Sequence, residues 1–283
     1  MDDLQTFLGK SIERPVHAQV AGFARALAAG QPGVVAVLAY GSALRDSSPA
    51  ETLIDYYLLV DEPGNLGGNS LLRWLGERVP PNVYYAERQD GESKLRSKYA
   101  VMTLKAFLAW NSPSTANPYL WARFAQPSRL VWVKDEATRR KVLEALAMAA
   151  RTAFAHGRYL SASDPWLGLF SNTYRTELRP ESASRARQIV TAESEYYGTL
   201  SRLLVATAPV ASSWASKRIW GKLWSVARLA KAAFTFQGGA DYAAWKIERH
   251  SGVKIEITDW QRRHPFLAGV LLLPRLLRKK GLN

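Results

Sequence analysis

Two continuous apolar runs in the first sixty residues predict buried strands. Residues 34–40 read Val-Val-Ala-Val-Leu-Ala-Tyr and end at Gly41-Ser42, and residues 53–60 form a second run that contains one acid, Asp55. Unbroken β-branched and apolar residues are typical of strands that are covered on both faces. The polar segment 43–52, which contains a proline, predicts a connecting loop.

The remaining pattern predicts further strands and then mostly helices. A leading helix is expected over residues 4–30, where apolar positions recur at helical spacing and Gly30 ends the pattern. The other expected elements, in chain order, are a helix near 70–78, a strand at 82–86, a helix from about 95 to 110, a strand at 129–133, and helices over 137–158, 182–206 and 213–237. This order predicts an α+β fold with a mixed sheet and flanking helices, followed by a mainly helical domain.

The change in pattern after residue 136 predicts the domain organisation. We expect a catalytic domain over residues 1–136, a helical domain over 137–250 and a basic amphipathic C-terminal segment over 251–283. A chain of 283 residues is long enough to bury a substantial core and to divide in this way.

The Gly41-Ser42 turn and Asp55 are the candidate chemical groups of this sheet. Backbone N–H groups of a small turn after a strand can surround a phosphate, and a carboxylate on the next strand can hold the Mg²⁺ that neutralises it. Because an acid between strand-forming residues is costly to bury alone, Asp55 needs a charged or hydrogen-bonding partner. The alternatives are an ordinary β-turn at Gly41 and an Asp55 bonded to backbone amides.

A second metal ligand is not evident on the same strand. Side chains two residues apart on a strand share a face, so a paired acid would stand at position 57, which is Tyr57. Either Asp46, Asp61 or Glu87 supplies the second carboxylate, or the triphosphate and water complete the Mg²⁺ shell. Asp61 lies six residues from Asp55, about 20 Å along a strand, and is therefore expected to end the strand.

Composition narrows the classes of partner. The net charge is +14 and the sequence pI about 10, a balance that attracts polyanions such as nucleotides, nucleic acid or anionic lipid headgroups. The chain has no cysteine, which excludes disulfides and thiolate metal sites, and its four histidines are too scattered to predict a zinc centre.

Two basic amphipathic stretches predict contact with an anionic membrane surface. Residues 213–237 combine Trp220, Leu223 and Trp224 with five Lys or Arg side chains on other faces, and residues 265–280 repeat the combination. The alternative is a core-packed helix with a solvated basic face.

The localisation follows from the ends and the apolar runs. The acidic N-terminus lacks the features of a signal or transit peptide, and the longest apolar run, 266–273, is too short to span a bilayer. We expect a bacterial cytoplasmic protein that binds peripherally to the inner face of the membrane. If the source is eukaryotic, we expect the protein on the matrix side of the mitochondrial membrane.

Ordered landmarks from residue 34 to residue 190 carry a family resemblance. They are Tyr40-Gly41-Ser42, Leu53–Tyr56 running into Val60–Pro63, Asn65-Leu66, Asn69-Ser70, Asn82–Tyr85, Lys98–Val101, Leu120–Phe124 with Gln126-Pro127, and Ser171–Arg175 with the helix after it. In this order they resemble the mitochondrial-type phosphatidate cytidylyltransferases, soluble enzymes with a nucleotidyltransferase fold and bacterial relatives. The chain departs from that family at Gly64–Asn69, where a histidine-containing stretch is replaced, and at Ala100 and Ala122, which replace glycines.

The resemblance implies an activity and roles for individual residues. It implies transfer of a cytidylyl group from CTP to phosphatidate with Mg²⁺, giving CDP-diacylglycerol and pyrophosphate. Gly41 and Ser42 would hold the triphosphate, Asp55 would ligate Mg²⁺, and Lys98 and Arg123 would compensate anionic oxygens; Ser42 would contact phosphate or metal and would not be acylated. For Lys98 and Arg123 the alternative is a solvated surface charge.

Two other functions fit the same residues. One is a nucleotidyltransferase that acts on a small molecule or an RNA end, with the basic helices used for nucleic acid or for packing. The other is a catalytically inactive scaffold that binds membrane or nucleic acid, which Tyr57 in the place of a second acid favours. The phosphatidate interpretation needs no obligate nucleic-acid partner.

Overall fold

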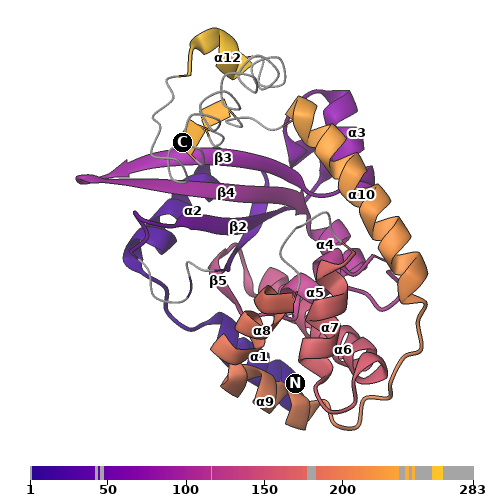
Figure 1. Cartoon of the computed structure of the whole chain (residues 1–283). Coiled ribbons are helices and arrows are strands. Elements are labelled where there is room, and N and C mark those ends of the chain that lie inside the picture. The colour runs from indigo at the N-terminus through magenta and orange to yellow at the C-terminus, as the bar shows by residue number, and fades with distance from the viewer. Residues whose placement is uncertain are drawn as a thin grey trace, which may run out of the picture.

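A mixed sheet forms the centre of the molecule (Figure 1). The computed structural model describes residues 2–41, 44, 48–115, 117–176, 183–235, 240–241, 244–245 and 257–263. The strands are β1 (Val34–Tyr40), β2 (Leu53–Val60), β3 (Asn82–Asp90), β4 (Ser93–Thr103) and β5 (Ser128–Val133), and they lie in the order β3-β4-β2-β1-β5. β2 and β4 pair in parallel, and the other neighbours pair antiparallel.

Helices cover both faces of this sheet. They are α1 (Asp3–Ile12), α2 (Ala18–Gly30), the 3₁₀ turn η2 (Pro63–Leu66), α3 (Ser70–Arg78), α4 (Leu104–Trp110), α5 (Tyr119–Phe124), α6 (Glu136–Leu160), α7 (Pro165–Tyr174), α8 (Ala183–Ala192), α9 (Ser194–Leu203), α10 (Trp214–Thr235) and α12 (Asp259–Arg263). α2 and η2 share a core with one face, and α1 and α4 to α9 share a larger core with the other. The fold is therefore α+β, as predicted.

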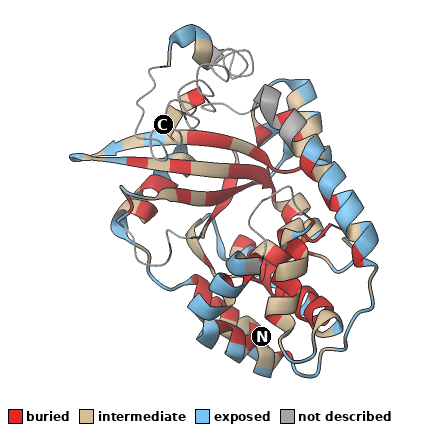
Figure 2. Ribbon diagram, in the orientation of Figure 1, coloured by how far each residue is buried: buried red, intermediate tan, exposed pale blue. Residues whose placement is uncertain are grey.

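Strands β1 and β2 are buried on both faces, as their uninterrupted apolar pattern predicts (Figure 2). Leu38 and Leu59 point into the larger core, whereas Val37 and Leu58 point into the smaller one, and all four are fully buried. Each such side chain contributes about 1.5–3 kcal/mol to folding by leaving water. β1 and β2 are thus held firmly at the point where the candidate chemical groups begin.

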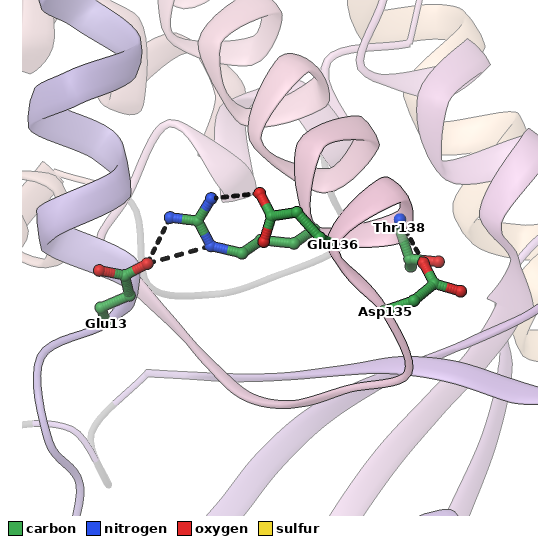
Figure 3. A network of polar contacts seen from close by, with 5 residues as sticks. Glu13, Asp135, Glu136 and Thr138 are labelled. Atoms are coloured by element: carbon green, nitrogen blue, oxygen red, sulfur yellow. Dashed lines mark hydrogen bonds and ion pairs between the residues drawn. The ribbon is translucent and has the colours of Figure 1, made fainter.

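The long helix α6 connects the sheet to the rest of the helical region. Asp135 caps it by accepting a 2.7 Å hydrogen bond from the Thr138 N–H, and Arg139 reaches Glu136 on the same helix and Glu13 just after α1 (Figure 3). These ion pairs are largely exposed and contribute little individually. The apolar face of α6, which shares the larger core with α1 and α7, supplies most of the attachment.

Two predicted helices are each interrupted in the structure. Residues 4–30 form α1 and α2, separated at residues 13–17, where Pro15 lacks the N–H that a continuous helix needs. Residues 182–206 contain α8 and α9 instead of one helix, with the break at Glu193. The predicted strands at 34–40, 53–60 and 129–133 and the helices near 70–78 and 137–158 are confirmed to within a few residues.

The helix predicted from about 95 to 110 is wrong over its first half. Residues 93–103 form strand β4, and only 104–110 are helical, as α4. Gly91, at φ +59°, makes the tight turn that joins β3 to β4, and β4 then pairs with both β3 and β2. The local apolar pattern suits either structure, and pairing with distant β2 decides for the strand. Lys98 therefore lies in a sheet.

The helix predicted over 213–237 is confirmed as α10, which packs along the molecule by one face. Trp224 meets Trp110 of α4 edge to face with ring centroids 5.3 Å apart, and the buried Lys231 ammonium donates to the Pro81 carbonyl and to Asn82 Oδ1. The opposite face leaves four large apolar side chains exposed: Ile219, Trp220, Leu223 and Val226. The second amphipathic stretch, 265–280, lies outside the described residues.

Within the described parts of the chain, no helix has the length and apolar character that crossing a bilayer requires.

His156 on α6 makes stability depend on pH. Its ring stacks on Trp121 with centroids 5.1 Å apart, and burial, followed by the positive charge of Lys217, lowers its pKa to about 4. Between pH 6.5 and pH 4 the imidazole of His156 is protonated in the unfolded chain and neutral in the folded chain. The free energy of unfolding therefore falls as the pH falls through this range. We expect His156→Phe to remove about 2 kcal/mol of this acid sensitivity between pH 7 and pH 4.5, measured by urea unfolding at the two pH values. An identical pH dependence in the variant would contradict the assignment.

Candidate active site

A row of side chains crosses the sheet at the end of β1. Register partners place Tyr85 of β3 beside Lys98 of β4, Lys98 beside Asp55 of β2, and Asp55 opposite Tyr40 of β1, which also pairs with Ser128 of β5. Paired residues on neighbouring strands project to the same face and lie about 5 Å apart. Two predicted site residues, Asp55 and Lys98, are thus neighbours on the face that carries the larger core.

Gly41 turns the chain directly beside the Asp55 carboxylate. It has φ +82°, a conformation that glycine adopts without strain, and a Cβ built on it would lie 3.3 Å from Asp55 Oδ2. The half-buried carboxylate therefore adjoins the backbone of the corner. Ser42, the other predicted member of this corner, lies outside the described residues, as does Asp46.

The remaining candidates for a second carboxylate lie away from Asp55. Asp61 stands at the far end of β2, where it accepts a 2.8 Å hydrogen bond from Asn65, and this bond is the main cause of its lowered pKa. Glu87 shares the face of Asp55 but lies two strands away, about 12 Å between Cα atoms by strand geometry. It forms ion pairs with Lys94 and Arg96. The described residues contain no group of three or more metal-ligating His, Asp or Glu side chains.

Tyr57 occupies the position of a paired acid and belongs to the core. It is fully buried, burial raises the pKa of its hydroxyl well above its usual value, and that hydroxyl donates to Tyr119 Oη at 3.2 Å. Its ring meets Phe124 of α5 edge to face, with centroids 5.0 Å apart. Tyr57 therefore fixes α5 against the sheet.

Arg123 extends from α5 over the same corner. Its guanidinium carbon lies 5.0 Å from the ring centroid of Tyr40, the residue opposite Asp55, and 5.3 Å from that of Tyr119. A small pocket beside it is lined by side chains of α5, α7 and the loop after α5: Tyr119, Ala122, Arg123, Gln126, Phe170, Thr173 and Tyr174. The structure thus brings Asp55, Lys98 and Arg123, which are far apart in sequence, to one end of the sheet.

Two side chains at this corner were not predicted from the sequence. One is Tyr119, whose ring contacts the Arg123 guanidinium. The other is Arg228 of α10, whose guanidinium carbon lies 3.7 Å from the Tyr119 ring centroid. In the sequence, Arg228 belongs to the basic side of an amphipathic helix and gives no sign of an inward position. The inward position of Arg228 follows from the packing of α10 against α4 and β3, which the sequence does not show.

Comparisons with known proteins add little to these observations. No family model matches the chain, and no curated protein matches it. Among solved structures, the chain is similar to a nucleotidyltransferase-like protein from Exiguobacterium sibiricum, with 10% identity, coverage of 91% of each chain and a TM-score of 0.29. Likeness at this TM-score does not establish a common fold or activity.

Gly41 gives the first test of this corner. A side chain at position 41 would need a strained positive φ and would crowd Asp55, so Gly41→Ala should lower the free energy of unfolding by about 1–2 kcal/mol. Gly30→Ala is the matched control, because a Cβ at Gly30 meets nothing within 4 Å. Equal urea unfolding curves for Gly41→Ala and the wild type would show that the corner is not built as described.

Proposed function

We propose that the protein transfers a nucleotidyl group from a nucleoside triphosphate. The observation that carries this proposal is the contact of the Asp55 carboxylate with the positive-φ turn at Gly41, with Lys98 in register beside it. Backbone N–H groups at such a turn suit phosphate oxygens, and the carboxylate suits the divalent cation that accompanies a triphosphate.

The residues fit a magnesium ion that arrives with its nucleotide. Mg²⁺ is commonly held by one or two carboxylates together with substrate phosphates and water, so Asp55 is a sufficient protein ligand. Bound in this way, Mg²⁺ would neutralise charge on the triphosphate.

We further propose CTP and phosphatidate as the substrates. Support comes from the sequence landmarks shared with phosphatidate cytidylyltransferases, because Arg123, Gln126, Thr173 and Tyr174, from two distant landmarks, line one pocket. In the reaction, an oxygen of the phosphatidate phosphate forms a bond to the α-phosphorus of CTP. The bond from that phosphorus to the bridging oxygen breaks, and pyrophosphate leaves.

The chain's own residues have positioning and electrostatic roles in this scheme. The acceptor phosphate is already ionised at neutral pH, so no general base is needed. Lys98 and Arg123 compensate the negative charge that gathers as two phosphates approach, and the turn at Gly41 orients the triphosphate.

A second candidate is a nucleotide-binding protein without turnover. Tyr57 favours it, because a buried tyrosine stands where a second metal-binding acid would project. Binding of Mg-CTP without release of pyrophosphate would distinguish this candidate from the enzyme.

Asp55 provides the direct test of catalysis. We expect Asp55→Ala to reduce release of pyrophosphate from CTP, Mg²⁺ and phosphatidate by at least 100-fold, because the metal loses its protein ligand. Asp61→Asn, at the opposite end of β2, should keep its turnover, and urea unfolding should show that both variants fold. Normal cytidylyl transfer by Asp55→Ala would exclude the proposed role.

The membrane interpretation rests on the outward face of α10. Ile219, Leu223 and Val226 are 63%, 54% and 55% exposed, and the basic side chains Arg218 and Lys222 are exposed on the same helix. Exposed apolar side chains beside cations suit the interface of an anionic bilayer.

Flotation with lipid vesicles tests this interpretation. The wild type should float with vesicles that contain phosphatidylglycerol and remain below with phosphatidylcholine alone. Serine at positions 219, 223 and 226 together should reduce flotation at least fivefold. A double variant at two other exposed positions, Val205→Ser with Val210→Ser, should float normally. Equal flotation of the triple variant and the wild type would show that the exposed face of α10 does not bind the membrane.

A further inference from the structure

Arg228 and Arg123 lie around the same aromatic ring at the candidate active site. The guanidinium carbon of Arg228, on α10, is 3.7 Å from the Tyr119 ring centroid, and that of Arg123, on α5, is 5.3 Å from it. The aromatic ring packs against both planar cations, and a cation–π contact does not neutralise the charge of a guanidinium.

The positive charge of Arg228 is not balanced within the described residues. Its Nη1 is buried without a hydrogen-bond partner there, and its Nη2 has one long contact, 3.4 Å, to Ser225 Oγ. The effect reaches Lys231, one turn along α10, where burial and then the charge of Arg228 lower the ammonium pKa to about 8. Buried donors on a cation, without an acid to receive them, favour binding of an anion.

The position of Arg228 relative to Asp55 indicates which anion it would meet. Asp55 lies opposite Tyr40, Arg123 lies over Tyr40, and Arg228 lies one further ring away, at Tyr119. A triphosphate at the Gly41 corner would therefore reach Arg123 before Arg228. Nucleotidyl transfer to a phosphate needs a second anion-binding group next to the triphosphate, and Arg228 and Arg123 both lie against the Tyr119 ring.

We propose that Arg228, together with Arg123 across Tyr119, binds the phosphomonoester of the acceptor substrate. This inference rests on the proposed nucleotidyl transfer and assigns a substrate-binding role to α10. Arg228 faces the active site while Ile219, Leu223 and Val226 face outward on the same helix. An acceptor with a phosphate and an apolar portion would thus find a contact for each on α10.

Binding measurements test the proposal without depending on turnover. Isothermal titration compares the wild type with Arg228→Ala and Arg228→Gln, using a short-chain water-soluble phosphatidate, glycerol 3-phosphate, and the matching diacylglycerol without phosphate. We expect both variants to bind phosphatidate at least tenfold more weakly and CTP with Mg²⁺ within twofold of the wild type. Arg228→Gln keeps most of the side-chain volume, so it remains informative if the alanine variant folds poorly.

Arg25→Ala is the control, because Arg25 is an exposed arginine on α2, which covers the opposite face of the sheet. It should bind every ligand as the wild type does. Loss of both phosphatidate and glycerol 3-phosphate binding in the Arg228 variants supports a site for phosphomonoesters in general. Loss of phosphatidate binding alone, with glycerol 3-phosphate not bound by the wild type, supports a site for the lipid.

Two results would overturn the proposal: unchanged phosphatidate affinity in a folded Arg228→Gln protein, or an equal loss of CTP affinity. Failure of the proposed function gives a different pattern, in which the wild type releases no pyrophosphate but still binds phosphatidate through Arg228. Conversely, the wild type could release pyrophosphate while Arg228→Gln has an unchanged KM for phosphatidate. That result would support the proposed enzymatic function and exclude a role of Arg228 in binding the acceptor.

Discussion

The pairing of β1 with β2 is the constraint on which the candidate site depends. It sets Asp55 opposite Tyr40 and next to the turn at Gly41, and it sends both side chains to the face covered by α4 to α7. A shift of the register by one residue would turn Asp55 to the opposite face. Leucines and valines of both strands pack into the cores on either side, so such a shift would require both cores to repack.

The helices outside the sheet supply positive charge to this fixed corner. α5 is held by contacts of Phe124 with Tyr57 and Phe107, and it carries Arg123 over Tyr40. α10 crosses from the helical region to β3 and carries Arg228 to Tyr119. Among the described residues, this corner combines the Asp55 carboxylate with several cations, an arrangement that suits a highly charged anion whose own oxygens complete the metal shell.

The sequence predicts what short-range patterns determine, and the structure adds what long-range packing determines. The unbroken apolar runs predict β1 and β2, and with them the proximity of Gly41 and Asp55. β4 pairs with β2, about forty residues earlier in the chain, and with neighbouring β3 through the turn at Asp90-Gly91. The apolar spacing alone misassigns it as a helix, although Asp-Gly is a local hairpin signal. Arg228 reaches the site only because α10 packs across the fold. The interruption at Pro15, in contrast, was available from the sequence.

The central claim is that a divalent cation joins Asp55 to a triphosphate at the Gly41 turn. A crystal structure with Mg²⁺ and a non-hydrolysable CTP analogue tests it most directly. The account predicts a metal ion about 2.1 Å from an Asp55 carboxylate oxygen, bridging to phosphate oxygens that lie against the backbone of Gly41. A triphosphate bound elsewhere, or a metal ion that Asp55 does not touch, would contradict it.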